Sequence, residues 1–445
     1  MRRRLRTIAI LAALAAAMVS VDAQAASYTV RARGGACGGA DTVCGSLAAA
    51  AKAMRSGDAV TIAAGRYEES PRFEAPGIVV RGSRRAPGVV IEGTVTFAGS
   101  GGRASVLGRL AVSTTAPGAA AVAVSGTAGV SVRDASLFSA SAAALAISGA
   151  AGSAVTRSRL LAGTSAVALG GGSLKLDSSM LSGGAGASGA GIEVLPAPQY
   201  ALVPAASIVA RHVTLAGAPA AIALRAGAAG ATARITDSIV LGTAPAGVEF
   251  TRTDRTSDPA ALFLNPQTRN FRLRPGSPAL DRGQITPGDS KTDLDGQPRT
   301  LGKASDLGAD ELDLVAPRVT ITRPRAGTRL AAGSRLRLAG RAQDPSGVAT
   351  VVFSLELLPR SGKTCRWFDP VRALVTRSCS EPVLVRAGLA KGGRWSYSGP
   401  RRLRLPAGRY RVRVSGADRA GVDGNTAPAS RRSITFRVRG AAAAP

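Results

Sequence analysis

The chain has few of the residues on which most active sites depend. Its 445 residues include one histidine, His212, and four cysteines. A zinc centre gathers about four cysteine or histidine ligands, and the two cysteine pairs lie far apart in the sequence. The sequence therefore offers too few cysteine and histidine ligands in one place for a zinc site. Two local disulfides in an oxidising compartment are predicted instead, Cys37 with Cys44 and Cys365 with Cys379.

Long apolar runs are also absent beyond the N-terminus. Residues 1–25 look like a secretory signal, with a basic start, an apolar run from Ile8 to Val21 and a small-x-small cleavage site at Ala23-Gln24-Ala25. The run is short and alanine-rich for a membrane span, and no other segment approaches about 18 apolar residues. We expect a mature chain without a transmembrane segment, secreted or at the cell surface.

Acidic residues are scarce in the last part of the chain. Residues 316–445 hold 26 basic against 6 acidic residues, a net charge of +20, whereas residues 26–315 carry a net of +6. Such a field attracts anionic partners. Two interpretations stay open: a surface for acidic polysaccharide, cell-wall polymer or nucleic acid, or the arginine bias of a GC-rich coding sequence, since 6 of the 57 basic residues are lysine. Few aromatic residues there could stack on bases, so nucleic acid is the least favoured partner.

A short pattern recurs between Val122 and Phe250: two bulky apolar residues flank one small or polar residue. Its last residues are spaced by 22 to 30 positions, which is typical of stacked repeats. The six triplets are Val122-Ala123-Val124, Leu145-Ala146-Ile147, Val167-Ala168-Leu169, Ile192-Glu193-Val194, Ile222-Ala223-Leu224 and Val248-Glu249-Phe250.

A second short strand follows each of the first five triplets after Gly, Ser or Ala, as in Val130–Arg133 and Ala154–Arg157. Two short strands per repeat with no helix between them describe one coil of a parallel β-helix. The alternative, a low-complexity linker, would not keep paired bulky residues at each step. We therefore predict an all-β fold with a β-helix over residues 26–315.

The start of this region resembles secreted right-handed parallel β-helix proteins of the pectate-lyase-like superfamily. Ser46 is suited to cap a helix from Leu47 to Arg55, and Gly57-Asp58-Ala59-Val60 opens a stretch that ends in Gly65-Arg66-Tyr67. In that superfamily such a helix plugs the open end of the stack. The resemblance implies the right-handedness and a structural role for this segment.

Three motifs after Phe250 resemble the C-terminal segment of exported bacterial β-helix proteins called choice-of-anchor Q. They are Phe271–Gly283, Asp293–Arg299 and Asp306–Glu311. The resemblance implies a stack of coils that ends in a cap on an extracellular protein, and it implies no catalysis.

About seven alternating strands follow over residues 316–440, and they predict a β-sandwich. The segments Pro324–Thr328, Ala342–Val348 and Gly416–Gly421 resemble bacterial Ig-like modules of surface and secreted proteins.

Candidate catalytic residues are few, because four of the six triplet centres are alanine. The other two, Glu193 and Glu249, would lie two coils apart, roughly 10 Å along the stack, near the upper limit for an inverting acid and base. Two solvated glutamates are the favoured interpretation. His212 has no acid or nucleophile placed near it by the repeat, so a surface or corner histidine is expected.

Candidate binding residues lie on the second strands. Four cations could form a basic line there, within one residue of register, or be ordinary outward side chains: Arg133, Arg157, Lys175 and Arg211. Asp134, Asp177 and Asp237 are expected to cap turns rather than hold a metal. Asp289, Asp293 and Asp295 resemble a calcium loop, but the EF-hand spacing fails, so Ca²⁺ is a weak candidate and no other cofactor is indicated.

The function favoured by the sequence is therefore a non-catalytic extracellular protein that binds acidic carbohydrate. A polysaccharide lyase or glycoside hydrolase is the alternative, and a purely structural surface protein is the third.

Overall fold

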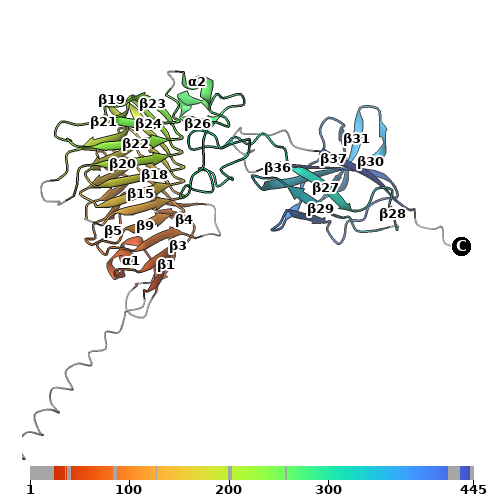
Figure 1. Cartoon of the computed structure of the whole chain (residues 1–445). Coiled ribbons are helices and arrows are strands. Elements are labelled where there is room, and N and C mark those ends of the chain that lie inside the picture. Colours follow the sequence, from red (N-terminus) through yellow and green to blue (C-terminus); the bar gives the residue numbers. More distant parts are fainter. Residues whose placement is uncertain are drawn as a thin grey trace, which may run out of the picture.

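The chain folds into two β domains (Figure 1). The computed structural model describes residues 25–440 except 36, 38–41, 84–87, 127, 199–202, 256–257, 332 and 419–430, so all but the last residue of the predicted signal lies outside the described residues. Two large parallel sheets form a β-helix, and a 4-stranded antiparallel sheet and a mostly antiparallel 7-stranded sheet follow. The predicted all-β fold class, with its parallel β-helix, is confirmed.

One face of the β-helix is an 11-stranded parallel sheet. In spatial order its strands are β2 (Val43–Cys44), β1 (Ser27–Gly35), β3 (Ala59–Ile62), β6 (Val79–Gly82), β9 (Ser105–Gly108), β12 (Val130–Arg133), β15 (Gly152–Thr156), β18 (Ser173–Asp177), β20 (Ser207–Arg211), β22 (Thr232–Thr236) and β24 (Val248–Thr251).

The other faces belong to a 13-stranded sheet made of two ladders. The first ladder starts with β4 (Gly65–Tyr67), β7 (Val89–Glu92), β10 (Ala111–Thr114), β13 (Ser136–Ser139) and β16 (Arg159–Ala162). The second starts with β5 (Arg72–Phe73), β8 (Val95–Phe97), β11 (Val122–Val124), β14 (Leu145–Ser148) and β17 (Val167–Gly170). The long strands β19 (Met180–Leu195) and β21 (Thr214–Leu224) join the two ladders, and β23 (Ile239–Thr243) pairs with β21.

The apolar triplets stack as the repeat predicts. Val124 pairs with Ile147 across β11 and β14, and Ile147 pairs with Leu169 across β14 and β17. These side chains are at most 2% exposed. Each coil therefore buries its apolar residues against its neighbours, which is how a stack of small repeats gains stability.

The sixth triplet is an exception to the predicted stack. Val248-Glu249-Phe250 forms β24 and pairs with β22 of the 11-stranded sheet, not with the triplet at Ile222. The prediction failed there because a period-2 pattern defines a strand but not the ladder to which the strand belongs.

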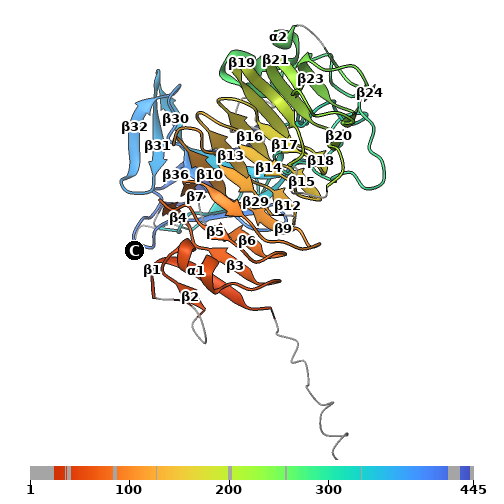
Figure 2. The same ribbon diagram turned by 90° about the vertical axis from the view of Figure 1, so that its left-hand side faces the viewer.

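A short helix closes the N-terminal end of the stack (Figure 2). Helix α1 spans Leu47–Ala53, and the Ser46 hydroxyl accepts the hydrogen bond of the Ala49 amide, as predicted. The Glu69 carboxylate accepts the amides of Leu47 and Ala48. A negative charge at a helix N-terminus is stabilising, so the two carboxylate contacts hold the plug on the first coils.

The segment after β24 does more than cap the last coil. It contains α2 (Pro259–Leu262), β25 (Phe263–Asn265), a 3₁₀ turn at Pro266–Thr268 and β26 (Asn270–Leu273). Leu262 and Phe271 of this segment are buried in one apolar cluster with Met180, Ile239 and Leu241 of the β-helix strands. The segment also runs back along one corner of the stack, which corrects the expectation of an end cap alone (Figure 1).

The second domain is a β-sandwich. A 4-stranded sheet contains β27 (Arg318–Arg323), β29 (Arg337–Gln343), β35 (Arg394–Ser398) and β34 (Gly388–Leu389). A 7-stranded sheet contains β28 (Arg329–Leu330), β37 (Arg431–Val438), β36 (Gly408–Asp418), β30 (Val348–Ser361), β31 (Thr364–Asp369), β32 (Ala373–Ser378) and β33 (Val385–Arg386). One apolar core with Leu338, Trp395, Phe353 and Tyr410 joins the two sheets. The Ig-like assignment stays a prediction.

Both predicted disulfides are present, Cys37–Cys44 and Cys365–Cys379. Among the described residues, no helix has the length and apolar character needed to span a membrane.

Candidate functional site

One corner of the β-helix carries a column of polar residues just after the strands of the 11-stranded sheet. From β9 to β24, each coil turns there through a non-glycine residue in the left-handed region, with φ from 43° to 56°: Arg109, Asp134, Arg157, Ser178, His212, Asp237 and Arg252. Their amides donate along the stack, as Asp134 does to the Thr156 carbonyl at 3.1 Å. The corner therefore places seven polar side chains in one line.

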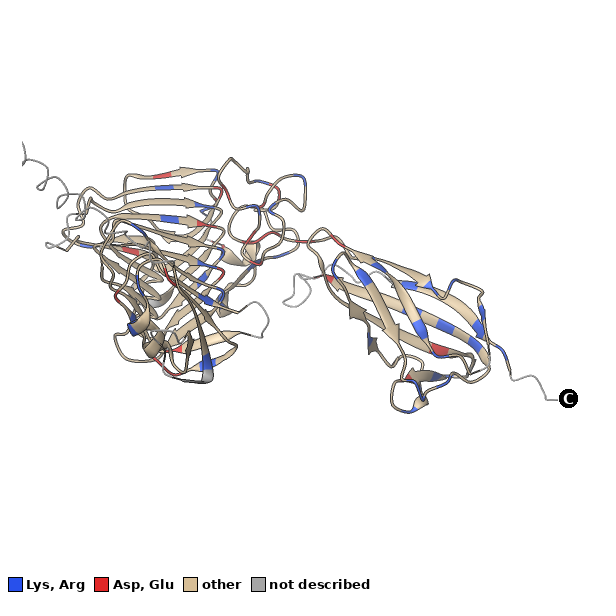
Figure 3. Cartoon of the chain, turned by 90° about the horizontal axis from the view of Figure 1, so that it is seen from below, with Lys and Arg blue, Asp and Glu red and all other residues tan. Residues whose placement is uncertain are grey.

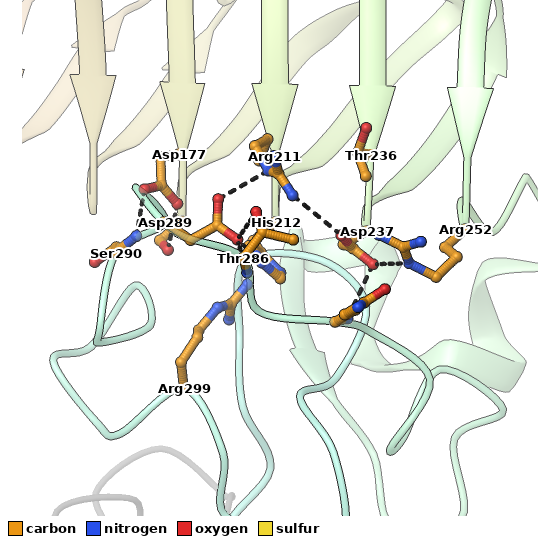
Figure 4. Close-up of polar contacts among 12 residues, drawn as sticks. Asp177, Arg211, His212, Thr236, Asp237, Arg252, Thr286, Asp289, Ser290 and Arg299 are labelled. Carbon is orange, nitrogen blue, oxygen red and sulfur yellow. Dashed lines mark hydrogen bonds and ion pairs between the residues drawn. The ribbon is translucent and has the colours of Figure 1, made fainter.

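Asp237 is the centre of the best-connected part of this column (Figure 4). Its side chain is fully buried, and its carboxylate accepts hydrogen bonds from Arg252 at 2.6 and 3.0 Å and from the Gln284 amide at 3.0 Å. Asp177, on a strand two coils earlier, accepts the Ser290 amide at 2.7 Å. Asp177 and Asp237 thus bind backbone amides of the C-terminal segment rather than those of the predicted turn caps, whereas Asp134 pairs with Arg157.

His212 lies in the same corner and is fully buried. Its Nε2 is 3.4 Å from Oδ2 of Asp289, which also pairs with Arg211 at 2.8 Å. Burial, together with the charge of Arg299, lowers the pKa of His212 to about 4. The imidazole is therefore neutral at physiological pH and enclosed, so it supports the packing of the C-terminal segment rather than proton transfer to a substrate.

The three aspartates of the predicted calcium loop do not come together. Asp289 lies against Arg211 and His212, whereas Asp293 and Asp295 gather with Asp310, their carboxylate oxygens within 4.8 Å of one another. Arg272 pairs with both Asp295 and Asp310 and supplies their countercharge.

The Asp293 carboxylate is occupied by backbone amides. It accepts those of Asp295, Gln297 and Glu311 at 3.0, 2.7 and 3.1 Å. Burial and the neighbouring carboxylate of Asp295 raise the pKa of Asp293 to about 6, and burial with the charge of Asp293 raises the pKa of Asp310 to about 8. These motif residues fasten the loops of the C-terminal segment to one another.

The predicted basic line is not a single line. Arg133 and Arg211 share a register position, but Lys175 lies two residues earlier in that register and Arg157 lies beyond the end of β15. Arg157 instead lines a groove of about 490 Å³ with Arg109 and Arg159, between the corner and residues 294–296. Asp134 binds Arg157 at 2.7 Å, and Asp295 binds Arg159 at 2.8 Å. Carboxylates of the β-helix itself thus neutralise two of the three arginines.

Glu193 and Glu249 do not form an acid and base pair. Glu193 lies in the second ladder of the 13-stranded sheet, where it binds Arg225 and Ser165. Glu249 lies on the 11-stranded sheet and binds Arg234 at 2.8 Å. The two carboxylates therefore face different sides of the stack.

The second domain carries a different arrangement, which we call the arginine row. Arg329 of β28 pairs in register with Arg437 of β37, and Arg437 pairs with Arg409 of β36. All three side chains are exposed, and none forms an ion pair with a described residue. Like charges directly opposite each other destabilise a sheet, so the row is held in place against its own repulsion.

Two further arginines extend the arginine row along β36. Arg411 and Arg413 point to the same face and share one carboxylate, Glu356, at 3.6 and 3.1 Å. Figure 3 shows basic residues across the strands of this domain, where acidic residues are few. Two of the five arginines on this face therefore share one buried carboxylate.

The sequence predicted that the second domain is basic, but it did not predict the arginine row. The alternation in Tyr410-Arg411-Val412-Arg413-Val414 places its arginines on one face of a strand. The pairing of β28 with β37 could not be inferred, because register is set by strands distant in sequence.

No model of a protein family matches the chain, and no curated protein matches it. Similar solved structures include full-length tailspike protein 2 from an Escherichia coli O157:H7 bacteriophage, at 10% identity, 87% of this chain, 52% of that chain and a TM-score of 0.29. The enzymatically active domain of the bacteriophage CBA120 tailspike protein 2 is 9% identical over 91% of this chain and 75% of its own, with a TM-score of 0.28. Murine CRIg matches 28% of this chain and 98% of its own at 10% identity and a TM-score of 0.17. The chain spans about half the length of the full-length tailspike, and likeness at these scores carries no argument about function.

Proposed function

We propose that this protein is an exported, non-catalytic protein that binds an acidic polysaccharide or anionic cell-wall polymer through the arginine row of its second domain. The observation that carries the proposal is the direct opposition of Arg329, Arg437 and Arg409 without a described countercharge. An anionic partner would remove the repulsion that the free domain bears.

The geometry of the arginine row suits a chain with regularly spaced carboxylates or phosphates. Neighbouring strands lie about 4.8 Å apart, which is comparable with the length of one sugar unit in an extended polysaccharide. Arginine forms bidentate hydrogen bonds with carboxylate and phosphate groups. A linear polymer crossing the three strands would meet one guanidinium per strand.

Export is the compartment that fits the two disulfides, because such bonds persist in oxidising environments. A non-catalytic role fits the placement of Glu193 and Glu249 on different faces, each bound to an arginine. The buried and neutral His212 gives no general base at the surface either.

The proposal is tested by binding of the full chain to immobilised polygalacturonate, with a neutral glucan as the reference polymer. We expect the triple variant Arg329→Gln, Arg409→Gln, Arg437→Gln to bind at least tenfold more weakly than the wild type. The matched control is Arg318→Gln, Arg323→Gln, Arg337→Gln on the 4-stranded sheet, whose arginines are also exposed but each lie opposite a neutral residue. It changes the net charge equally and should retain most of the binding.

Equal loss in the two triple variants would mean that total charge, and not the arginine row, attracts the polymer. Unchanged binding in the arginine-row variant would overturn the site. Release of unsaturated or reducing sugars from the polymer by the wild type would overturn the non-catalytic role and favour the lyase or hydrolase alternative.

A further inference from the structure

Three carboxylates from distant parts of the sequence meet where the two domains join. Asp313 ends the C-terminal segment of the β-helix, Asp344 lies between β29 and β30, and Asp418 ends β36. One carboxylate oxygen of each lies within 4.8 Å of those of the other two. Acidic residues mark this junction in Figure 3.

Two of the three aspartates are buried, Asp344 is half-buried, and Asp313 and Asp344 each have a buried oxygen without a hydrogen-bond partner. Asp313 is 0% exposed and Asp418 is 1% exposed. Asp313 uses Oδ1 to accept the Val315 amide at 2.8 Å, but its Oδ2 is buried with no hydrogen-bond partner. Oδ2 of Asp344 is likewise buried with no hydrogen-bond partner. Oδ1 of Asp344 accepts hydrogen bonds from the amide and the hydroxyl of Ser346 at 2.8 and 2.6 Å.

The unpartnered oxygens of Asp313 and Asp344 are costly unless something positive is bound. A buried carboxylate oxygen without a partner loses its hydration and gains nothing in return. The other three-aspartate group of the chain differs, because Arg272 pairs with two of its members. No described arginine or lysine forms an ion pair with Asp313 or Asp344.

We propose that Asp313, Asp344 and Asp418 bind a calcium ion that clamps the β-helix to the β-sandwich. Calcium takes oxygen ligands at about 2.3–2.6 Å, so ligands on opposite sides of one ion are about 5 Å apart. The separation of at most 4.8 Å among the three carboxylates fits a shared ion. Calcium also accepts irregular sets of six to eight oxygens, and water would complete the shell.

The clamp would fix the orientation of the domains, because only a short connection lies between Asp313 and the first strand of the sandwich. Leu314 and Val315 in this connection are 54% and 48% exposed, so apolar packing holds it weakly. With the ion bound, the connection is pinned through Asp313 to the loops that carry Asp344 and Asp418. Extracellular modules bind calcium with dissociation constants of about 0.1–1 mM, which suits an exported protein.

The experiment is a titration of the metal-stripped full chain with CaCl₂, followed by calorimetry and by thermal unfolding. We expect one bound ion per chain and a rise of about 5 °C or more in the unfolding temperature at 10 mM CaCl₂. Asp313→Asn and Asp344→Asn should each weaken binding at least tenfold and remove most of the rise. Asp295→Asn, from the arginine-paired group, is the matched control and should keep both.

Limited proteolysis of the connection tests the clamp itself. We expect cleavage near Leu314 to slow at least fivefold with calcium in the wild type and to be insensitive to calcium in Asp344→Asn. Absence of binding at 10 mM CaCl₂ would overturn the site and indicate that the carboxylates share a proton instead. Binding that Asp295→Asn removes would assign the ion to the other group, and calcium binding without protection of the connection would overturn the clamp.

Discussion

The two domains use arginine in opposite ways. In the β-helix, Arg157 and Arg252 are each held by an aspartate of the same turn column, and Arg159 is held by Asp295 of the C-terminal segment. In the sandwich, Arg329, Arg409 and Arg437 oppose one another with no described carboxylate between them. Arginine therefore fastens parts of the first domain together, whereas the second domain leaves the three arginines of the arginine row exposed.

The corner of the β-helix offers the largest expected effect. We expect Asp237→Ala to destabilise the first domain by about 3 kcal/mol, because it leaves the Gln284 amide and the Arg252 guanidinium without their acceptor. Thermal or urea unfolding of the full chain measures this as a shift of the β-helix transition.

The matched control is Asp134→Asn in the same column. Its side chain is 43% exposed, so we expect a loss of less than about 1 kcal/mol. Equal losses in Asp134→Asn and Asp237→Ala would show that burial by the C-terminal segment contributes nothing to the corner.

Removal of the disulfide in the second domain should distinguish the unfolding transitions of the two domains. Cys365 and Cys379 close a loop of 14 residues, and their replacement by serine should cost about 3 kcal/mol. We expect the transition of the second domain to move to lower temperature while that of the β-helix stays in place. A joint shift of the two transitions would indicate that the domains unfold as one unit.

The carboxylates of the C-terminal segment predict that the stability of the first domain depends on pH. The raised pKa values, about 6 for Asp293 and about 8 for Asp310, mean that the folded state holds protons that the unfolded chain has released. Their contribution is fully present below the unfolded pKa near 4 and is lost as the pH rises through these values. The unfolding temperature of the β-helix should therefore fall between pH 5 and pH 9.

Asp310→Asn provides the check, because it mimics the protonated form. Its unfolding temperature should fall less than that of the wild type between pH 7 and pH 9. A wild-type β-helix whose stability rises over this range would contradict the assigned direction.

The smallest expected effect is a change in salt dependence. Exposed charges are screened within about 8 Å at 0.15 M salt, so binding of wild-type protein to polygalacturonate should weaken as NaCl is added. The residual binding of the arginine-row variant should weaken less steeply. Identical salt dependence in the two proteins would place the contacts elsewhere.

The sequence predicted the stack well because the repeat carries its own register. Val122, Leu145 and Val167 recur at nearly constant spacing, and backbone pairing places them above one another. The helix that closes the stack could be predicted from Ser46, because an N-cap contacts residues close to it in the sequence. Both disulfides could be predicted from the closeness of each cysteine pair in the sequence and from the expected oxidising compartment.

Contacts between distant segments could not be predicted in the same way. Nothing near Asp289 in the sequence indicates Arg211 or His212 as its partners, so its separation from Asp293 and Asp295 could not be predicted. The arginine row likewise depends on the parallel pairing of β28 with β37, more than 100 residues away in the chain. Glu249 was placed on the wrong ladder because its triplet resembles the others in pattern but not in position.

The central claim is that the arginine row of the second domain binds an anionic polymer. Hydrogen–deuterium exchange of the full chain with and without polygalacturonate tests it most directly, because both domains are observed in one sample. The account predicts slower exchange in β28, β36 and β37, around Arg329, Arg409 and Arg437, and no change at the corner of the β-helix. Protection confined to the groove around Arg109 and Arg157, with the sandwich strands unaffected, would contradict it.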